Sequence, residues 1–487
     1  MLAAMPAPTP TPGESPAPGA GRDRGDACPG ALRLHSADDG SLARVRLPGG
    51  LLTVRQADEL AALAEELGDG HLDLTSRGNV QLRGLAATCG AGLGERLRGA
   101  GLLPSDRHER VRNVVASPLS GLDGNGRADT RTWARALDAL LCADPAVTAL
   151  SGRFLFGLDD GRGDIAALAP DVTLIAADEG GDAVLGYGDG PHGLRIPAAD
   201  APRAALLAAL HFLDAVRRHG TGSWRVRELP DREPLDRDGA ALAGRLAAAG
   251  IPAAPAQLPP GTAPRPPAPG PVPGPDGRTA LSVGAPLGRL TVAQWRLLAR
   301  TAAEHGDGEL RVTPWRGLVV PGLAAAHAGD RLAALAAAGL VTDPASPWHR
   351  AGACAGRPGC AKSRADVRAD AGAALAGARP PRTETLPVYW SGCERRCGRP
   401  GGGRWVDVLA TDDGYRVAVR DEGRDEGWGE GRDESRETPD PVRPVAPDGL
   451  TAAVAAARTS TPDDPTTRRP TTRHPTTRPR RRDDATT

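Results

Sequence analysis

The chain has 487 residues, enough for two or three domains, and its 60 basic residues balance 60 acidic ones. A formal net charge of +0 gives no argument for binding nucleic acid or an anionic membrane. The sequence has no apolar run long enough to cross a bilayer, and its start lacks the features of a secretion signal. We therefore expect a cytoplasmic protein whose cysteines are kept reduced.

Both ends of the sequence have biased composition. Residues 1–28 form a leader rich in Pro and Ala, and residues 421–487 form a charged tail rich in Pro and Thr. Such segments bury too little apolar surface to fold alone, so we predict that both termini are disordered. Just before the tail, residues 404–420 alternate apolar and polar side chains around Asp-Asp-Gly, a pattern typical of a β-hairpin.

An internal repeat organises the chain. Residues 52–85 align without a gap to residues 290–323. Each copy starts at a threonine that suits a helix cap, continues through an amphipathic helix, breaks at Gly-Asp-Gly and enters an alternating strand. Helix and strand, repeated at so long a period, predict a duplicated α/β module rather than a solenoid.

Composition divides the rest of the chain around this repeat. Residues 250–278 contain a Pro-rich stretch that we interpret as a semi-rigid linker. We predict an α+β, pseudo-twofold protein, with its segments in this order: a first half domain at 29–103, an α/β domain at 104–232, the linker, a second half domain at 279–345 and a cysteine-bearing segment at 346–420.

Four of the 7 cysteines fall in two pairs. Cys354 and Cys360 have the spacing C-x5-C, and Cys393 and Cys397 have the spacing C-x3-C. Four cysteine thiolates complete a [4Fe–4S] cluster, and the glycines around both pairs permit the tight turns that aim several thiolates at one centre.

Two other interpretations of these cysteines are less favourable. A structural zinc site pairs cysteines at shorter spacings than C-x5-C. Unliganded core cysteines rarely fall in two close pairs. The spacing therefore favours an iron–sulfur cluster.

The repeat, the stretches "DLTSRGNVQLRG", "RVRNVVASPLSG" and "SGRFLFGLDDGRGDIA", and the two cysteine pairs together resemble the nitrite/sulfite reductase superfamily. The resemblance covers roughly residues 30–420. It implies duplicated ferredoxin-like half domains together with domains that bind a tetrapyrrole and a [4Fe–4S] cluster. Within the superfamily, "ACAGRPGCAKSRADVRADA" and "TPWRGL" look most like the aerobic precorrin-3B synthases of cobalamin biosynthesis.

The resemblance also implies the residues of the site. The cysteines that would bind the metal are Cys354, Cys360, Cys393 and Cys397. The residues at positions that contact a tetrapyrrole or an anion are Arg77, Arg83, Arg112, Asn113, Arg153 and Arg316. Arginine suits these positions because its planar fork grips carboxylates with two hydrogen bonds. No general acid or base is assigned.

One position departs from the pattern of the sulfite reductases. In those enzymes the segment that matches "GRFLF" carries two basic residues, separated by one position, that bind the small oxyanion. Here Arg153 fills the first position and Leu155 the second. Since a leucine cannot neutralise sulfite or nitrite, the sequence favours a tetrapyrrole as the substrate.

The expected activity follows from this resemblance. It is a monooxygenase that converts precorrin-3A to the hydroxy-lactone precorrin-3B with O2 and electrons from a ferredoxin or an NAD(P)H reductase. The alternatives are a siroheme-dependent ferredoxin nitrite or sulfite reductase, and a degenerate member without enzymatic activity. Besides the cluster, the resemblance leaves open an additional non-haem iron or a siroheme. If a siroheme is bound, Cys397 would bridge the cluster to the haem.

Overall fold

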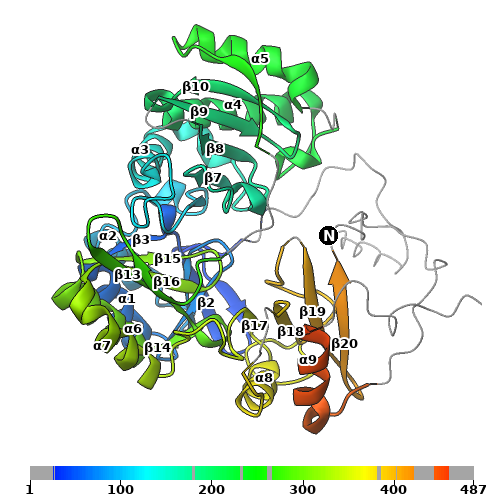
Figure 1. Ribbon diagram of the computed structural model, residues 1–487. Helices are drawn as coiled ribbons and strands as arrows, with labels where there is room; N and C mark the ends of the chain where they lie inside the picture. Colours follow the sequence, from blue (N-terminus) through cyan, green and yellow to red (C-terminus); the bar gives the residue numbers. More distant parts are fainter. Residues whose placement is uncertain are drawn as a thin grey trace, which may run out of the picture.

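The computed structural model describes residues 26, 28–177, 181–230, 234–259, 266–380, 385–401, 403–421 and 444–459. The rest of the predicted disordered leader and tail lies outside these residues. Figure 1 shows three parts: an α/β domain in cyan and green, the two half domains in blue and yellow-green, and a smaller domain in yellow to red. In the described part of the chain, no helix is both long enough and apolar enough to span a membrane.

The two half domains exchange strands. The first sheet has the order β1-β2-β5-β4-β14 and the second has the order β12-β13-β16-β15-β3, all antiparallel. The strands of the first sheet, in that order, are His35–Ala37, Gly40–Val45, Val80–Leu85, His71–Leu74 and Arg289–Thr291. Those of the second are Gly270–Pro273, Arg278–Gly284, Gly317–Ala324, Glu309–Val312 and Leu51–Thr53. Each half thus contributes one short strand to the sheet of the other.

The repeat determines the helices of these halves. Helix α1 (Val54–Glu66) begins with a capping box of Thr53 and Gln56, and α6 (Val292–His305) begins with the equivalent box of Thr291 and Gln294. Helices α2 (Gly90–Gly99) and α7 (Ala325–Ala337) follow the repeats, and one hydrophobic core joins both halves. The predicted duplicated module is confirmed.

The α/β domain contains a mixed sheet of order β11-β10-β9-β8-β7-β6. Strands β6 (Val114–Ala116), β7 (Phe156–Asp159) and β8 (Val172–Ala176) are parallel, while β9 (Asp182–Tyr187), β10 (His192–Pro197) and β11 (Ala254–Gln257) extend the sheet antiparallel. Its helices are α3 (Thr130–Ala143), α4 (Ala201–His219) and α5 (Pro234–Ala248).

The predicted linker at 250–278 is only partly a linker. Its beginning forms β11 at the edge of the α/β sheet, and its end forms β12 at the edge of the second half domain. Edge strands tolerate proline because one side of such a strand needs no ladder hydrogen bonds, which explains how a Pro-rich segment becomes strand here.

The third part contains the sheet β17-β18-β19-β20, made of Ala351–Ala353, Val388–Ser391, Arg404–Thr411 and Gly414–Asp421. The first three strands are parallel, and β19 and β20 form the hairpin that the sequence predicted. Helix α8 (Val367–Ala376) packs with this sheet in one core.

The prediction of a tail disordered from residue 421 is wrong for residues 444–459. Val445 forms a β-bridge with Tyr415, and helix α9 (Leu450–Arg458) follows it. Leu450 and Val454 are buried in the core of the third part, which accounts for the order of this segment. The sequence did not reveal this helix because its apolar face is short and most of its other residues are alanine.

Candidate metal centre and tetrapyrrole cavity

The sheet of the third part brings the two cysteine pairs together. Cys354 directly follows β17, and Cys393 follows β18, its parallel neighbour. Parallel strands end at the same edge of a sheet, so the two cysteine turns leave from one edge. The backbone N–H of Cys354 donates to the Trp390 carbonyl oxygen at 2.9 Å, and the Gly392 N–H donates to the Cys354 sulfur at 3.2 Å.

Cys354 and Cys397 lie within electrostatic reach of each other and of Cys360 and Cys393. Burial raises the pKa of Cys354, nearby backbone N–H groups lower it, and Cys393 and Cys360 raise it further. Burial also raises the pKa of Cys397; Arg395 opposes this, and the other three cysteines add to it. Because like charges raise each other's pKa, the thiols are expected to ionise when a metal centre compensates their charge.

The arrangement fits a multi-iron cluster better than a single zinc ion. Within the described ranges, the acidic or sulfur ligands close enough to share one ion are Asp159, Asp160 and Asp164, not the cysteines. Thiolates bound to different irons of a cube lie farther apart than the four ligands of one zinc. The donor set therefore suits a [4Fe–4S] cluster, and Cys397 is the most exposed of the four cysteines.

The first half domain holds the loop between Cys354 and Cys360. The Arg83 guanidinium donates to both carboxylate oxygens of Asp39 at 2.8 Å and to the Gly359 carbonyl oxygen at 2.8 Å. Arg83, predicted to contact a tetrapyrrole or an anion, positions a cysteine-bearing loop in the structure.

A cavity of about 970 Å³ lies beside the cysteine turns and is lined by all three parts of the chain. Its described lining residues include no aspartate or glutamate. Apolar side chains such as Leu155, Trp315 and Trp348 form much of its wall. The arginines that line it are Arg77, Arg225, Arg316, Arg350, Arg399, Arg404 and Arg458.

Two predicted contact residues line this cavity. Arg77 is half-buried, and burial together with Arg225 lowers its pKa to about 10, so it stays protonated at neutral pH. Arg316 lies between the cavity and the Cys397 turn. It packs 5.4 Å from the Tyr389 ring centroid and donates to the Gly398 carbonyl oxygen.

Three other predicted residues are absent from the described lining. Arg112 donates to both carboxylate oxygens of Asp138 at 2.7 Å, a buried structural pair. Arg153 is exposed and stacks 4.5 Å from the Trp224 ring centroid. Asn113 donates a 2.8 Å hydrogen bond to the Gly152 carbonyl oxygen. The same oxygen accepts a hydrogen bond from Arg77, so Asn113 and Arg77 hold one backbone carbonyl group together.

Arg225, Arg350, Arg399, Arg404 and Arg458 line the cavity but were not predicted. The first four were missed because none of them lies in a motif of the resemblance, and because an arginine outside a motif carries little information in so arginine-rich a chain. Arg458 was missed because it lies in the tail that was predicted to be disordered.

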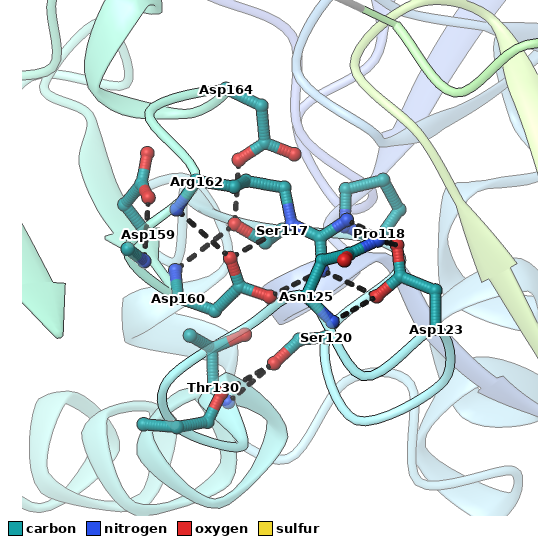
Figure 2. A network of polar contacts seen from close by, with 12 residues as sticks. Ser117, Pro118, Ser120, Asp123, Asn125, Thr130, Asp159, Asp160, Arg162 and Asp164 are labelled. Carbon is teal, nitrogen blue, oxygen red and sulfur yellow. Dashed lines mark hydrogen bonds and ion pairs between the residues drawn. The ribbon is translucent and has the colours of Figure 1, made fainter. Parts of the chain in front are cut away.

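A network of carboxylates supports one wall of the cavity (Figure 2). The Asp159 carboxylate accepts hydrogen bonds of 2.9–3.0 Å from the backbone N–H groups of Gly161, Gly163, Ile165 and Ala166. Arg162 joins Asp160 to Asp123, and Ser117 donates to Asp164 at 2.6 Å. These contacts hold the loop that packs Ile165 against Leu155.

Comparison with known proteins agrees with this geometry. Residues 35–88 and 272–338 match the nitrite/sulfite reductase ferredoxin-like half domain. The chain has the fold of the nitrite/sulfite reductase superfamily. The structure of the Mycobacterium tuberculosis NirA protein superposes with a TM-score of 0.65 at 20% identity, covering 85% of this chain and 79% of that one.

Two of the curated relatives that this chain resembles are oxidoreductases of different kinds. A ferredoxin–nitrite reductase of Synechococcus elongatus is 28% identical over 74% of this chain and 74% of its own length. A precorrin-3B synthase of Sinorhizobium is 26% identical over 81% of this chain and 83% of its own length. These matches agree with the resemblance seen in the sequence and indicate an oxidoreductase.

Proposed function

We propose that this protein is a precorrin-3B synthase-like monooxygenase of cobalamin biosynthesis, acting in the cytoplasm. The observation that carries the proposal is the cavity: arginines line it, its described lining has no carboxylate, and two of its lining side chains, Arg316 and Tyr389, bind the turn of Cys397. The greater coverage of the precorrin-3B synthase relative, 83% of its length against 74% for the nitrite reductase, supports the same choice.

The shape and charge of the cavity suit a flat polycarboxylate. A tetrapyrrole fringed with carboxylates needs cations around its rim and apolar surface against its faces. Arg77 provides a cation from the first half domain, and Arg350, Arg404 and Arg458 provide cations from the third part. Arg225, from the α/β domain, also lines the cavity but is paired with Asp171. Trp315, Trp348 and the prolines of the linker supply apolar surface.

Leu155 argues against a small oxyanion as the substrate. It is buried at 5% exposure and lines the cavity at the position where the resemblance expects a second base. Its neighbour in the motif, Arg153, is exposed and stacked on Trp224. Neither residue of the expected basic pair therefore serves a small anion within the cavity.

The roles of the chain's own residues follow from this geometry. The arginines bind and orient the substrate carboxylates, and the apolar wall around Leu155 excludes water. Cys354, Cys360, Cys393 and Cys397 would hold the [4Fe–4S] cluster, which supplies electrons one at a time. In the overall reaction one oxygen atom of O2 enters precorrin-3A, and the other leaves as water with two electrons and two protons from the external donor.

The second candidate is a siroheme-dependent, ferredoxin-linked nitrite or sulfite reductase. The 28% identity to the nitrite reductase favours it, as do the hydrogen bonds from the cavity-lining Arg316 and Tyr389 to the Cys397 turn. The absorption spectrum of the anaerobically purified protein separates the two: siroheme bands indicate the reductase, and a cluster shoulder alone indicates the synthase. A non-enzymatic member, suggested by an irregular C-terminus, loses support because α9 is packed into the core.

The direct test is incubation of the full-length protein with precorrin-3A, O2 and a reduced ferredoxin or an NAD(P)H reductase. We expect a product heavier by one oxygen atom, with the label of 18O2 incorporated. Absence of this product from protein that retains its cluster and binds the substrate would overturn the proposal.

A further inference from the structure

Two cavity-lining side chains hold consecutive carbonyl groups of the cysteine turn. The Tyr389 hydroxyl donates to the Cys397 carbonyl oxygen at 2.7 Å, and Arg316 donates to the Gly398 carbonyl oxygen. The turn that carries Cys397 is thus fixed from the cavity side.

The turn is packed tightly against this pair. Gly398 has a φ of +84°, and a Cβ at this position would lie 2.8 Å from the Tyr389 hydroxyl and 3.0 Å from Arg316 Nη2. A Cβ at Gly352 would lie 2.9 Å from the Tyr389 ring. Glycine is required at both places, and the contact leaves little room for the turn to move while both side chains stay in position.

We propose that Arg316 and Tyr389 couple occupancy of the cavity to the position of Cys397. Arg316 faces both the cavity and the cysteine turn, so a ligand carboxylate competes with the Gly398 carbonyl for its donors. Binding of an anionic tetrapyrrole, as the proposed function requires, then loosens the turn of the most exposed cysteine. Coupling of this kind is reciprocal: the state of the Cys397 turn also affects ligand affinity.

Both are therefore positioning residues for Cys397. Tyr389 limits how far the turn moves when Arg316 is drawn toward the ligand, since its own hydrogen bond to the Cys397 carbonyl oxygen remains. Arg316 is the element that responds to the ligand, because its guanidinium carries charge and reaches both partners.

The experiment uses full-length, cluster-free protein and the metal-free tetrapyrrole polycarboxylate uroporphyrin. Binding is measured by porphyrin fluorescence, and alkylation of Cys397 and Cys354 by iodoacetamide is followed by peptide mass spectrometry. We expect saturating uroporphyrin to accelerate Cys397 alkylation about twofold to tenfold, the range of one hydrogen bond. The alkylation rate of the half-buried Cys354 should not change.

Variants identify the coupling residue. In Arg316→Gln, Cys397 should be alkylated at the rate seen in wild type saturated with uroporphyrin. Uroporphyrin should still bind this variant through the other arginines, but it should no longer change that rate. Tyr389→Phe keeps the ring packing and should raise the basal rate of Cys397 alkylation. Because the coupling is reciprocal, uroporphyrin should also bind this variant more tightly than it binds wild type. The matched control is Arg296→Gln on α6, which removes an exposed ion pair with Glu65 of α1 and should behave as wild type.

The outcomes distinguish this inference from the proposed function. Uroporphyrin that binds but slows Cys397 alkylation equally in wild type and Arg316→Gln would indicate simple occlusion and overturn the coupling. Binding with no change in the Cys397 rate would also overturn it. Absence of binding to folded wild-type protein would overturn both the coupling and the tetrapyrrole function.

Discussion

The indole Nε1 of Trp295 donates a 2.8 Å hydrogen bond to the carbonyl oxygen of Ala57, a residue 238 positions earlier in the chain. This separation equals the offset of the internal repeat, so the two residues occupy equivalent positions in α6 and α1. Equivalent positions meet where a twofold axis crosses an interface. The contact therefore marks the pseudo-twofold axis of the half domains.

We predict that Trp295→Ala destabilises the protein by about 3–5 kcal/mol, the range for truncating a fully buried aromatic residue. Trp295 has 0% exposure, so the substitution leaves a cavity between the two helices. Urea unfolding followed by circular dichroism measures the effect. Arg300→Ala, on the exposed face of the same helix, should change stability little. Equal losses in the two variants would contradict a special role for the axis.

The half domains could be predicted from the sequence because their signals are local. Capping residues and helical periodicity lie within each copy of the repeat, and both copies formed the expected helix and strand. The exchange of β3 and β14 between sheets could not be predicted, because an alternating pattern shows which face is buried but not which strand is the neighbour.

Each of the four clustered cysteines should be necessary for iron binding. We predict that Cys360→Ser lowers the bound iron and sulfide of anaerobically purified protein to a small fraction of wild type, because serine is a poor replacement for a thiolate ligand. Cys142→Ser, on α3 in a different domain, is the control and should retain the cluster. Iron content and the visible spectrum measure both. A full cluster in Cys360→Ser would contradict the ligand set.

The candidate site was predicted unevenly, for a physical reason. Cysteine spacing is informative because the chain has only 7 cysteines, whereas its 60 basic residues are almost all arginine. Sequence cannot separate an arginine paired with an acid, such as Arg112 with Asp138, from one that lines a cavity, such as Arg77. That distinction depends on which carboxylates the fold brings near.

Arg77 and Arg153 provide a matched pair for the cavity, since both were predicted and only Arg77 lines it in the described structure. We expect Arg77→Gln to weaken uroporphyrin binding about tenfold or more, the loss of a charged hydrogen bond of about 1.5–3 kcal/mol. Arg153→Gln should change it less than about twofold, because an exposed cation contributes little. Fluorescence titration measures both. Equal weakening would place Arg153 in the binding site.

The C-terminal helix should be required for the cavity. Arg458 lines it and donates to the carbonyl oxygens of Leu386, Pro347 and His349 at 3.0, 2.6 and 2.7 Å. Burial and nearby Arg350 lower its pKa to about 10, which keeps it charged at neutral pH. One side chain thus joins two segments of the cavity wall.

Arg458→Lys keeps the charge but cannot satisfy three carbonyl groups in the same geometry. We predict that it weakens uroporphyrin binding, and that Arg458→Ala weakens it further and also lowers the thermal unfolding midpoint. Arg416→Ala, on the adjacent β20, is the control. Unchanged binding in Arg458→Ala would show that α9 does not support the cavity.

Asp164 should make stability depend on pH. Burial and the charge of Asp159 raise its pKa to about 7, with Asp160 adding to the shift and Ser117 and Arg162 opposing it. The ordinary value is 3.8, so between that pH and about 7 the folded protein holds a proton that the unfolded chain has released. The contribution of Asp164 to stability therefore falls as pH rises through this range, and it stays low above about 7.

Asp164→Asn stays neutral at every pH and removes this loss. We expect its stability relative to wild type to increase from pH 4 to pH 7 by up to about 1.4 kcal/mol per pH unit, and then to level off. Urea unfolding of the two proteins across this range measures the difference. Asp413→Asn, at the exposed turn of the β19–β20 hairpin, should show no such trend. A constant difference between Asp164→Asn and wild type would mean that Asp164 is already ionised in the folded protein, with its charge compensated by Ser117 and Arg162.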